Sequence, residues 1–265
     1  MVEHTHITVA ESKSILKFVE EGDETWPRWD RFLKLGKKKA YHIGNICDTC
    51  KFFFERLEGA DKTLDATALA DALGGGLETL EHAPDLARIL PDGDYTAILT
   101  TVEPKLTMPG DALDYFANEQ AAYWGLSYTT GLPHYPRTPY YRARTRALSP
   151  EAALFEFVVP MMPPRTLNAD RLRHYRRRGK SDPLPTAVAV SVLDVKEFHD
   201  YNDDNEEVHM QHWCLAHYLL DGHHKTHAAS LEDEPVSLLS FLALGKGVAS
   251  EEERRALPGL LAGKE

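Results

Sequence analysis

Hydrophobic and polar residues recur along this chain with two different periods, and the change between them predicts a mixed α+β or α/β protein. In the first third, apolar residues recur with helical spacing, which predicts a mostly helical N-terminal region. Helices are expected in five segments of this region: residues 12–19, 29–35, 50–57, 63–73 and 77–90. The triple glycine at 74–76 should end the fourth helix, and Pro84 should divide the fifth.

From about residue 150 the pattern changes to short β-rich runs. One strand is expected before this change, at 95–102, and strands are expected after it at 155–159 and 186–193; residues 213–220 and 236–244 are apolar runs. A helix should begin at Asn168 or Asp170 and end at Gly179, and a shorter one should follow the Asp221-Gly222 turn. Residues 123–146, rich in aromatic residues, prolines and arginines, are expected to form an ordered loop. The pattern divides the chain into an N-terminal region of unknown role (1–150), a C-terminal domain (151–250) and a tail (251–265).

Composition and charge narrow the class of protein. The 265 residues are 43% hydrophobic and 27% charged, as in a folded globular protein. The net charge of −11 argues against non-specific binding to nucleic acid, which depends on neutralising phosphates. No apolar run approaches the ~20 residues of a membrane span, and the N-terminus lacks the pattern of a secretory signal. Three cysteines suit a reducing cytoplasm, where we expect the protein to be located.

The most informative motif is the run Asp221 to Lys225, Asp-Gly-His-His-Lys, between an apolar run and a short predicted helix. Backbone N–H groups at a helix start, together with the helix dipole, favour a bound anion. Gly222 would let the backbone approach the ligand, Lys225 would add a positive charge, and neutral His223 and His224 would donate hydrogen bonds. The motif therefore predicts a phosphate site; the simpler alternative is a polar turn in which Asp221 caps the helix.

The order of elements around this motif resembles the ParB/sulfiredoxin superfamily over about residues 155–245. The matching features are a strand ending in Pro160, a helix that carries Arg171, a strand led by Pro185, and the Asp-Gly-His-His turn with its closing helix and strand. The Asp-Gly-His-His variety is found in the free-serine kinases of that superfamily. Lys225 stands where the family usually has arginine, so the charge is kept and the bidentate fork is lost. No cysteine occupies the sulfiredoxin position and no helix-turn-helix follows residue 245, so neither sulfinic-acid repair nor DNA partition is expected.

The resemblance implies a nucleotide-binding domain that uses ATP or ADP, or CTP, together with Mg²⁺. In such a domain the acidic group of the turn lies beside the transferring phosphate or its metal, and the histidines contact phosphate oxygens. The candidate catalytic residues are Asp221 and His223. The candidate nucleotide- or phosphate-binding residues are Gly222, His223, His224, Lys225 and Arg171.

The pair Cys47 and Cys50 has the spacing of half a zinc site or of a redox pair. A zinc site needs further ligands, for which Cys214 and His212 are the candidates. A redox role needs a helix start that lowers the pKa of one thiol. The third interpretation is that the cysteines are ordinary buried thiols, which pack as small hydrophobic residues.

Three functions are compatible with these motifs. The first is a nucleotide-dependent phosphotransferase, or a nucleotide hydrolase, that acts on a small molecule. The second is a non-catalytic nucleotide-sensing regulator or interaction protein, whose basic helix at 171–180 would contact a partner. The third is a metal-dependent nuclease that uses the histidines as ligands. The partners expected for the first are a nucleotide and a small-molecule substrate, without nucleic acid and without a membrane. The acidic stretch 194–207 would either contribute a base or metal ligand or form a solvated loop.

Overall fold

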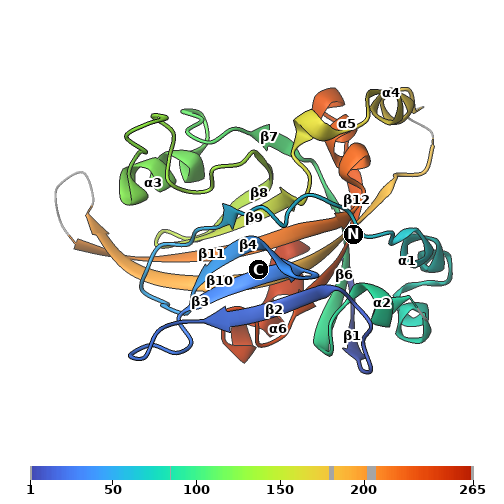
Figure 1. Cartoon of the computed structure of the whole chain (residues 1–265), viewed down its shortest axis with the longest axis horizontal. Coiled ribbons are helices and arrows are strands. Elements are labelled where there is room, and N and C mark those ends of the chain that lie inside the picture. Colours follow the sequence, from blue (N-terminus) through green and yellow to red (C-terminus); the bar gives the residue numbers. More distant parts are fainter. Residues whose placement is uncertain (1, 84, 179–181, 202–206, 264–265) are drawn as a thin grey trace.

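The computed structural model describes residues 2–263 except 84, 179–181 and 202–206. It contains one large twisted sheet, a smaller sheet and helices around them (Figure 1). The eight strands of the larger sheet, in spatial order, are β1 (Glu3–Val9), β6 (Gly93–Val102), β12 (Val236–Ala243), β10 (Thr186–Tyr201), β11 (Glu207–Asp221), β9 (Ala152–Pro160), β8 (Tyr140–Ser149) and β7 (Lys105–Thr107). The smaller sheet has the order β2 (Leu16–Glu21), β3 (Asp30–Leu35), β4 (Lys38–Asn45) and β5 (Glu55–Arg56).

The helices are short and lie outside the sheets. The α-helices are α1 (Thr67–Ala72), α2 (Leu86–Ile89), α3 (Tyr115–Trp124), α4 (Ala169–Arg176), α5 (His223–Glu232) and α6 (Glu251–Leu261). The 3₁₀ turns are η1 (Leu73–Gly75), η2 (Leu77–His82) and η3 (Pro164–Thr166). None of the described helices has the length and apolar character that a membrane crossing requires.

Both faces of the larger sheet are covered by other elements. Successive side chains along β10 point to opposite faces, so neighbouring residues of this strand contact different layers. Val190 belongs to a hydrophobic cluster that includes Leu33 of β3, so the smaller sheet packs on one face. Ala189 belongs to a second cluster with Ala229 of α5, on the other face. Leu257 of α6 belongs to a third cluster, so α6 covers a further part of the same face as α5. The N-terminal strands β1 and β6 extend the same sheet by pairing β6 with β12.

The direction of the central strands determines where two helices begin. β9 and β11 are parallel, and their register pairs Pro160 with Leu219, so both strands end at the same edge of the sheet. η3 and α4 follow β9, and α5 follows β11 directly. α4 and α5 contact each other at this edge, in agreement with their neighbouring positions in Figure 1. In sheets with parallel strands, ligands commonly bind where the strands end and helices begin.

The mixed α+β class is confirmed, but the prediction of a mostly helical N-terminal region is wrong. Three of the expected helices are replaced by β2, β3 and an extended segment that ends in β5. In β3 the buried residues Arg31, Leu33 and Leu35 alternate with half-buried ones, which is a period of two. Such a short apolar run also fits a helical spacing, so periodicity alone does not distinguish a strand from a helix here. Helical turns near 63–73 and 77–90 are present as α1, η1, η2 and α2, while Pro84 lies outside the described residues.

The C-terminal predictions agree better with the structure. The strands expected near 95–102, 155–159 and 186–193 are confirmed as β6, β9 and β10, and the apolar runs 213–220 and 236–244 form β11 and β12. α4 begins after Asn168 as expected, while Gly179, its expected end, lies outside the described residues. β10 continues to Tyr201 and β11 starts at Glu207, so much of the expected polar loop is strand. Residues 123–146 contain the end of α3 and the start of β8, and 251–265 contains α6.

Candidate functional site

The start of α5 has a backbone conformation that requires glycine. Gly222 precedes the helix with φ of 90°, in the left-handed region. A Cβ at this position would lie 2.7 Å from the Cα and Cβ atoms of Ala187 in β10, so a side chain would also clash. Asp221 Oδ1 accepts the N–H of Gly222 at 2.6 Å. No side chain caps α5, so Asp221 does not act as its N-cap.

His223 is a buried, neutral histidine with one unused donor. Its Nε2 accepts the backbone N–H of Met161 at 2.9 Å, which ties α5 to the end of β9. Burial is the main cause that lowers the pKa of His223 to about 3, with a smaller effect from His224. Because Nε2 accepts, the proton of the neutral ring is on Nδ1. Among the described residues this Nδ1 has no hydrogen-bond partner, although the side chain is only 3% exposed.

His224 connects the start of α5 to the start of α4. Its Nε2 accepts the N–H of Asn168 at 3.0 Å, and the Asn168 side chain accepts the N–H groups of Asp170 and Arg171. Burial lowers the pKa of His224, and the positive charge of Arg171 lowers it further. The structure therefore brings Arg171 into the environment of the Asp221–Lys225 turn, as predicted from the sequence.

Lys225 is anchored, and the first turn of α5 has unused donors. Lys225 Nζ donates to the carbonyl of Thr186 at 2.8 Å, at the start of β10. In the part of the chain that is described, the first-turn N–H groups of residues 223–225 have neither a side-chain cap nor a backbone acceptor outside the helix. The buried Thr226 Oγ1 is also without a partner there. The five residues of the Asp221–Lys225 turn thus lie at one edge of the sheet close to Arg171, with the uncapped first-turn N–H groups of α5 beside them.

The basic segment at 171–178 pairs mainly with α5 and the residues after it. Arg176 forms an ion pair with Glu232, and Arg178 forms one with Glu234 at 3.2 Å. The acidic stretch has a different partner, since Asp194 is fully buried and bonded by Arg31 at 2.6 and 2.8 Å. The two oppositely charged blocks are therefore not each other's main partners.

The cysteine and histidine candidates for zinc are not brought together. Cys47 and Cys50 form a disulfide in the loop between β4 and β5, so they are not the ordinary buried thiols of the third interpretation, and this pair does not support the argument from a reducing cytoplasm. Cys214 lies in the hydrophobic core, where burial raises the pKa of its thiol well above the usual value. His212 is also buried, with Nδ1 3.6 Å from Glu119. The described residues contain no group of three or more His, Cys, Asp or Glu side chains suited to a metal ion.

A buried chain of polar residues crosses three strands of the larger sheet and was not predicted. Ser191 Oγ lies 2.7 Å from His217 Nδ1, and His217 Nε2 lies 3.1 Å from Glu156 Oε1. Arg144 approaches Glu156 at 3.4 Å. These residue types occur in hydrolytic triads, but Ser191, His217 and Glu156 are fully buried and cannot meet a substrate. No spacing in the sequence could have revealed them, because they meet only through strand pairing.

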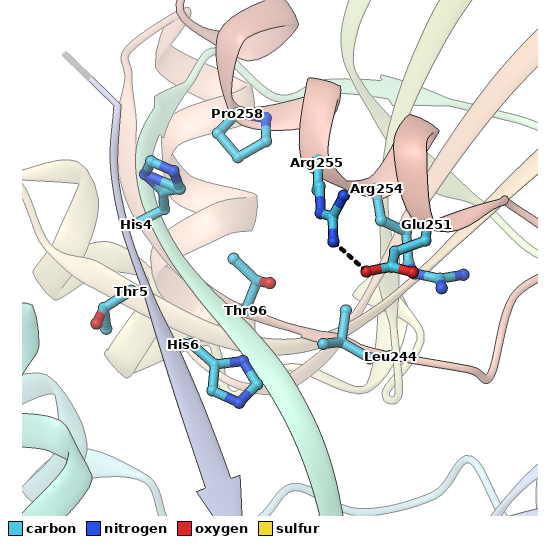
Figure 2. Close-up of a pocket in the computed structure, with 9 residues that line it drawn as sticks. All are labelled: His4, Thr5, His6, Thr96, Leu244, Glu251, Arg254, Arg255 and Pro258. Carbon is cyan, nitrogen blue, oxygen red and sulfur yellow. Dashed lines mark hydrogen bonds and ion pairs between the residues drawn. The ribbon is translucent and has the colours of Figure 1, made fainter.

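A cavity of about 610 Å³ lies away from this corner, between β1 and α6 (Figure 2). His4 and His6 from β1 and Arg254 and Arg255 from α6 line it, and Arg255 is paired with Glu251. It contains no residue of the Asp221–Lys225 turn, so we do not place phosphate chemistry there.

Comparison of the chain with protein-family models, with curated proteins and with solved structures finds no match. Any function is therefore argued from the geometry of the site and from the sequence motif.

Proposed function

We propose that this protein is a nucleotide-dependent phosphotransferase acting on a small molecule, with phosphates held where α4 and α5 begin. The observation that carries the proposal is the uncapped start of α5, where the first-turn N–H groups of residues 223–225 have no side-chain cap and no outside backbone acceptor among the described residues. A phosphate oxygen would accept hydrogen bonds from these N–H groups and would also benefit from the helix dipole.

Charge at the same corner supports an anionic ligand. Arg171 acts on His224 electrostatically, so its guanidinium is close enough to add positive charge to the turn. Lys225 is held in place by the Thr186 carbonyl and keeps further N–H donors. His223 remains neutral, so its buried ring adds no charge to the corner.

The remaining chemistry would come from the nucleotide and its metal. ATP or ADP, or CTP, would supply the phosphoryl group, and Mg²⁺ would neutralise charge on the phosphates. Asp221 fits this metal, since Mg²⁺ in such sites takes one or two carboxylates and otherwise phosphate and water oxygens. One Asp221 oxygen accepts the Gly222 N–H, which orients the carboxylate. A cytoplasmic location, where these nucleotides are abundant, belongs to the proposal.

The two other functions expected from the sequence are not equally well supported by the structure of this corner. A nucleotide sensor would use the same binding corner without turnover, so it remains the second candidate. A metal-dependent nuclease would need the histidines as ligands, but Nε2 of His223 and of His224 already accepts a backbone N–H. We therefore do not carry the nuclease forward.

The first experiment is thermal unfolding with ATP, ADP or CTP in the presence of Mg²⁺. At a ligand concentration of about 100 Kd, binding should stabilise the protein by about 2.7 kcal/mol. Arg171→Ala should weaken nucleotide binding by roughly tenfold, as expected for the loss of a charge-assisted contact. Arg173→Ala is the matched control, because Arg173 lies on the same helix and pairs with Asp170. No stabilisation by any of the nucleotides, or equal effects of the two variants, would refute the site.

The second experiment separates a kinase from a sensor. Nucleotide turnover is measured with a panel of amino acids and alcohols as acceptors. Asp221→Asn should abolish turnover and leave the fold intact. Binding without turnover for every acceptor would favour the sensor, and unchanged turnover in Asp221→Asn would remove the proposed role of this carboxylate.

A further inference from the structure

The hairpin between β2 and β3 carries two tryptophans over a cavity that the proposed nucleotide site does not use. The cavity has a volume of about 480 Å³. Its lining consists of aromatic and acidic side chains with one lysine: Glu21, Gly22, Asp23, Trp26, Trp29, Asp30, Phe32 and Lys39. Trp26 is 58% exposed, and its ring centroid lies 5.5 Å from that of Trp29 at an interplanar angle of 56°. The two indoles therefore form adjoining walls of the cavity.

The hairpin holds Trp26 in this exposed position by several hydrogen bonds. Asp23 Oδ1 accepts the N–H groups of Thr25 and Trp26, both at 2.8 Å. The N–H of Asp23 donates to the Trp26 carbonyl, and the N–H of Trp29 donates to the Glu21 carbonyl. A Cβ on Gly22 would lie 1.6 Å from the Trp26 carbonyl oxygen, so the turn is closely packed. The walls are thus formed before any ligand arrives, which reduces the entropy cost of binding.

The cavity already accommodates a cation from the chain itself. Lys39 Nζ lies 3.6 Å from the centroid of the Phe32 ring and 2.6 Å from Glu21 Oε2. This ammonium is stabilised by both the ring face and the carboxylate. The three acidic residues of the lining outnumber this one lysine, so the cavity retains a negative field.

The state of the carboxylates indicates which kind of cation fits. Glu21 is bonded by Lys39, Asp23 by the backbone of its own turn, and Asp30 by His42 at 3.0 Å. Each of these bonds engages one oxygen of its carboxylate, and a ligand would meet the aromatic faces and the negative field of all three groups. A quaternary ammonium group suits such a site, because it has no N–H to satisfy and binds well to indole faces. We infer that the cavity beneath the Trp26–Trp29 hairpin binds a quaternary ammonium group, from a small molecule such as choline or from a trimethylated lysine.

The test is a titration of the full-length protein followed by the indole N–H signals of its four tryptophans in ¹H–¹⁵N spectra. The probes are choline, tetramethylammonium and a peptide with trimethyl-lysine, at matched ionic strength. The signals of Trp26 and Trp29 should shift and saturate, while those of Trp124 and Trp213 stay unchanged. The neutral isostere 3,3-dimethyl-1-butanol should bind at least about fivefold more weakly than choline, because it lacks the cation–π attraction. Tighter binding of choline would identify a small molecule as the source, and tighter binding of the peptide a protein partner.

Variants keep the test independent of folding. Trp26→Ala should weaken binding at least about fivefold, and its exposed side chain makes a folding defect easy to exclude by circular dichroism. Tyr128→Ala removes another fully exposed ring and should leave the affinity unchanged. Lys39→Met should strengthen binding, since it frees the Phe32 face. The inference is overturned if no probe gives a saturable shift, if the neutral isostere binds as well as choline, or if Trp26→Ala binds like the wild type.

Discussion

His223 should make the stability of this protein fall as the pH drops from 7 to 5. Its ring is buried, and burial is the main cause that lowers its pKa from 6.5 to about 3. In the unfolded chain the same ring takes up a proton near pH 6.5. Below that pH the unfolded state binds more protons, so acidification favours unfolding. The contribution is fully present above pH 6.5 and is lost progressively as the pH falls toward 3.

The size of the effect follows from the difference between the two pKa values. Each pH unit within this interval changes the free energy of unfolding by about 1.4 kcal/mol. Between pH 7 and pH 5 the loss attributable to His223 is therefore about 2 kcal/mol. Protonation of Nε2 would also place two donors opposite each other, because this atom accepts the N–H of Met161.

The assay compares urea unfolding of the wild type and of His223→Gln at pH 5, 6 and 7. The glutamine carbonyl oxygen is able to accept the Met161 N–H, but the amide does not titrate. The wild type should lose about 2 kcal/mol more than the variant between pH 7 and pH 5. His224 and His227, whose pKa values are lowered mainly by burial, are present in both proteins and cancel.

Parallel stability curves for the wild type and His223→Gln would refute the reasoning. They would mean that the folded protein tolerates a protonated ring at this position. In that case the start of α5 would not contain the buried neutral ring that the structure places there. Long-range ¹H–¹⁵N spectra of the imidazole give an independent reading, because they report directly which ring nitrogen carries the proton.

Three further changes test the packing of the fold. Asp194→Asn removes the carboxylate that neutralises the buried Arg31 and should lower the free energy of unfolding by about 3–5 kcal/mol in urea denaturation; a loss below about 1 kcal/mol would contradict the ion pair. Gly222→Ala should reduce the melting temperature more than Gly245→Ala, since both glycines have positive φ but only Gly245 has open space for a methyl group; equal shifts would contradict the close contact. Cys214 should react with thiol reagents only after unfolding, because it is fully buried; rapid labelling of the native protein would show otherwise.

The fold was predictable where one element carried a long, consistent pattern. The Thr186–Leu193 run is rich in β-branched residues and could be assigned to a strand directly. The short N-terminal strands could not be assigned from the sequence, because the burial of their residues depends on partners that are distant in the chain. Arg31 reads as a polar residue in the sequence, yet it occupies a buried position of β3 through its ion pair with Asp194. These two residues are 163 positions apart, so a local pattern could not reveal the pairing.

The candidate site was predictable as a motif, but the roles of its side chains were not. In the turn from Asp221 to Lys225, the two histidines and the lysine were expected to contact an anion, and Asp221 to lie beside the phosphate or its metal. In the structure His223, His224 and Lys225 also hold the framework, through hydrogen bonds to the backbone at residues 161, 168 and 186. Those contacts depend on which strands are neighbours and in which direction they run. Strand direction and order are global properties, and a single sequence does not determine them.

The parallel pairing of β9 and β11 brings the starts of α4 and α5 together at the proposed phosphate site. Because both strands end at the same edge, α4 and α5 begin side by side, and His224 accepts the N–H of Asn168 across the gap. The positive ends of two helix dipoles and the charge of Arg171 therefore add at one place. An antiparallel β9 would have placed the start of α4 at the opposite edge and left α5 with its own dipole and Lys225. The direction of β9, rather than the motif alone, accounts for the neighbouring starts of α4 and α5 at the proposed phosphate site.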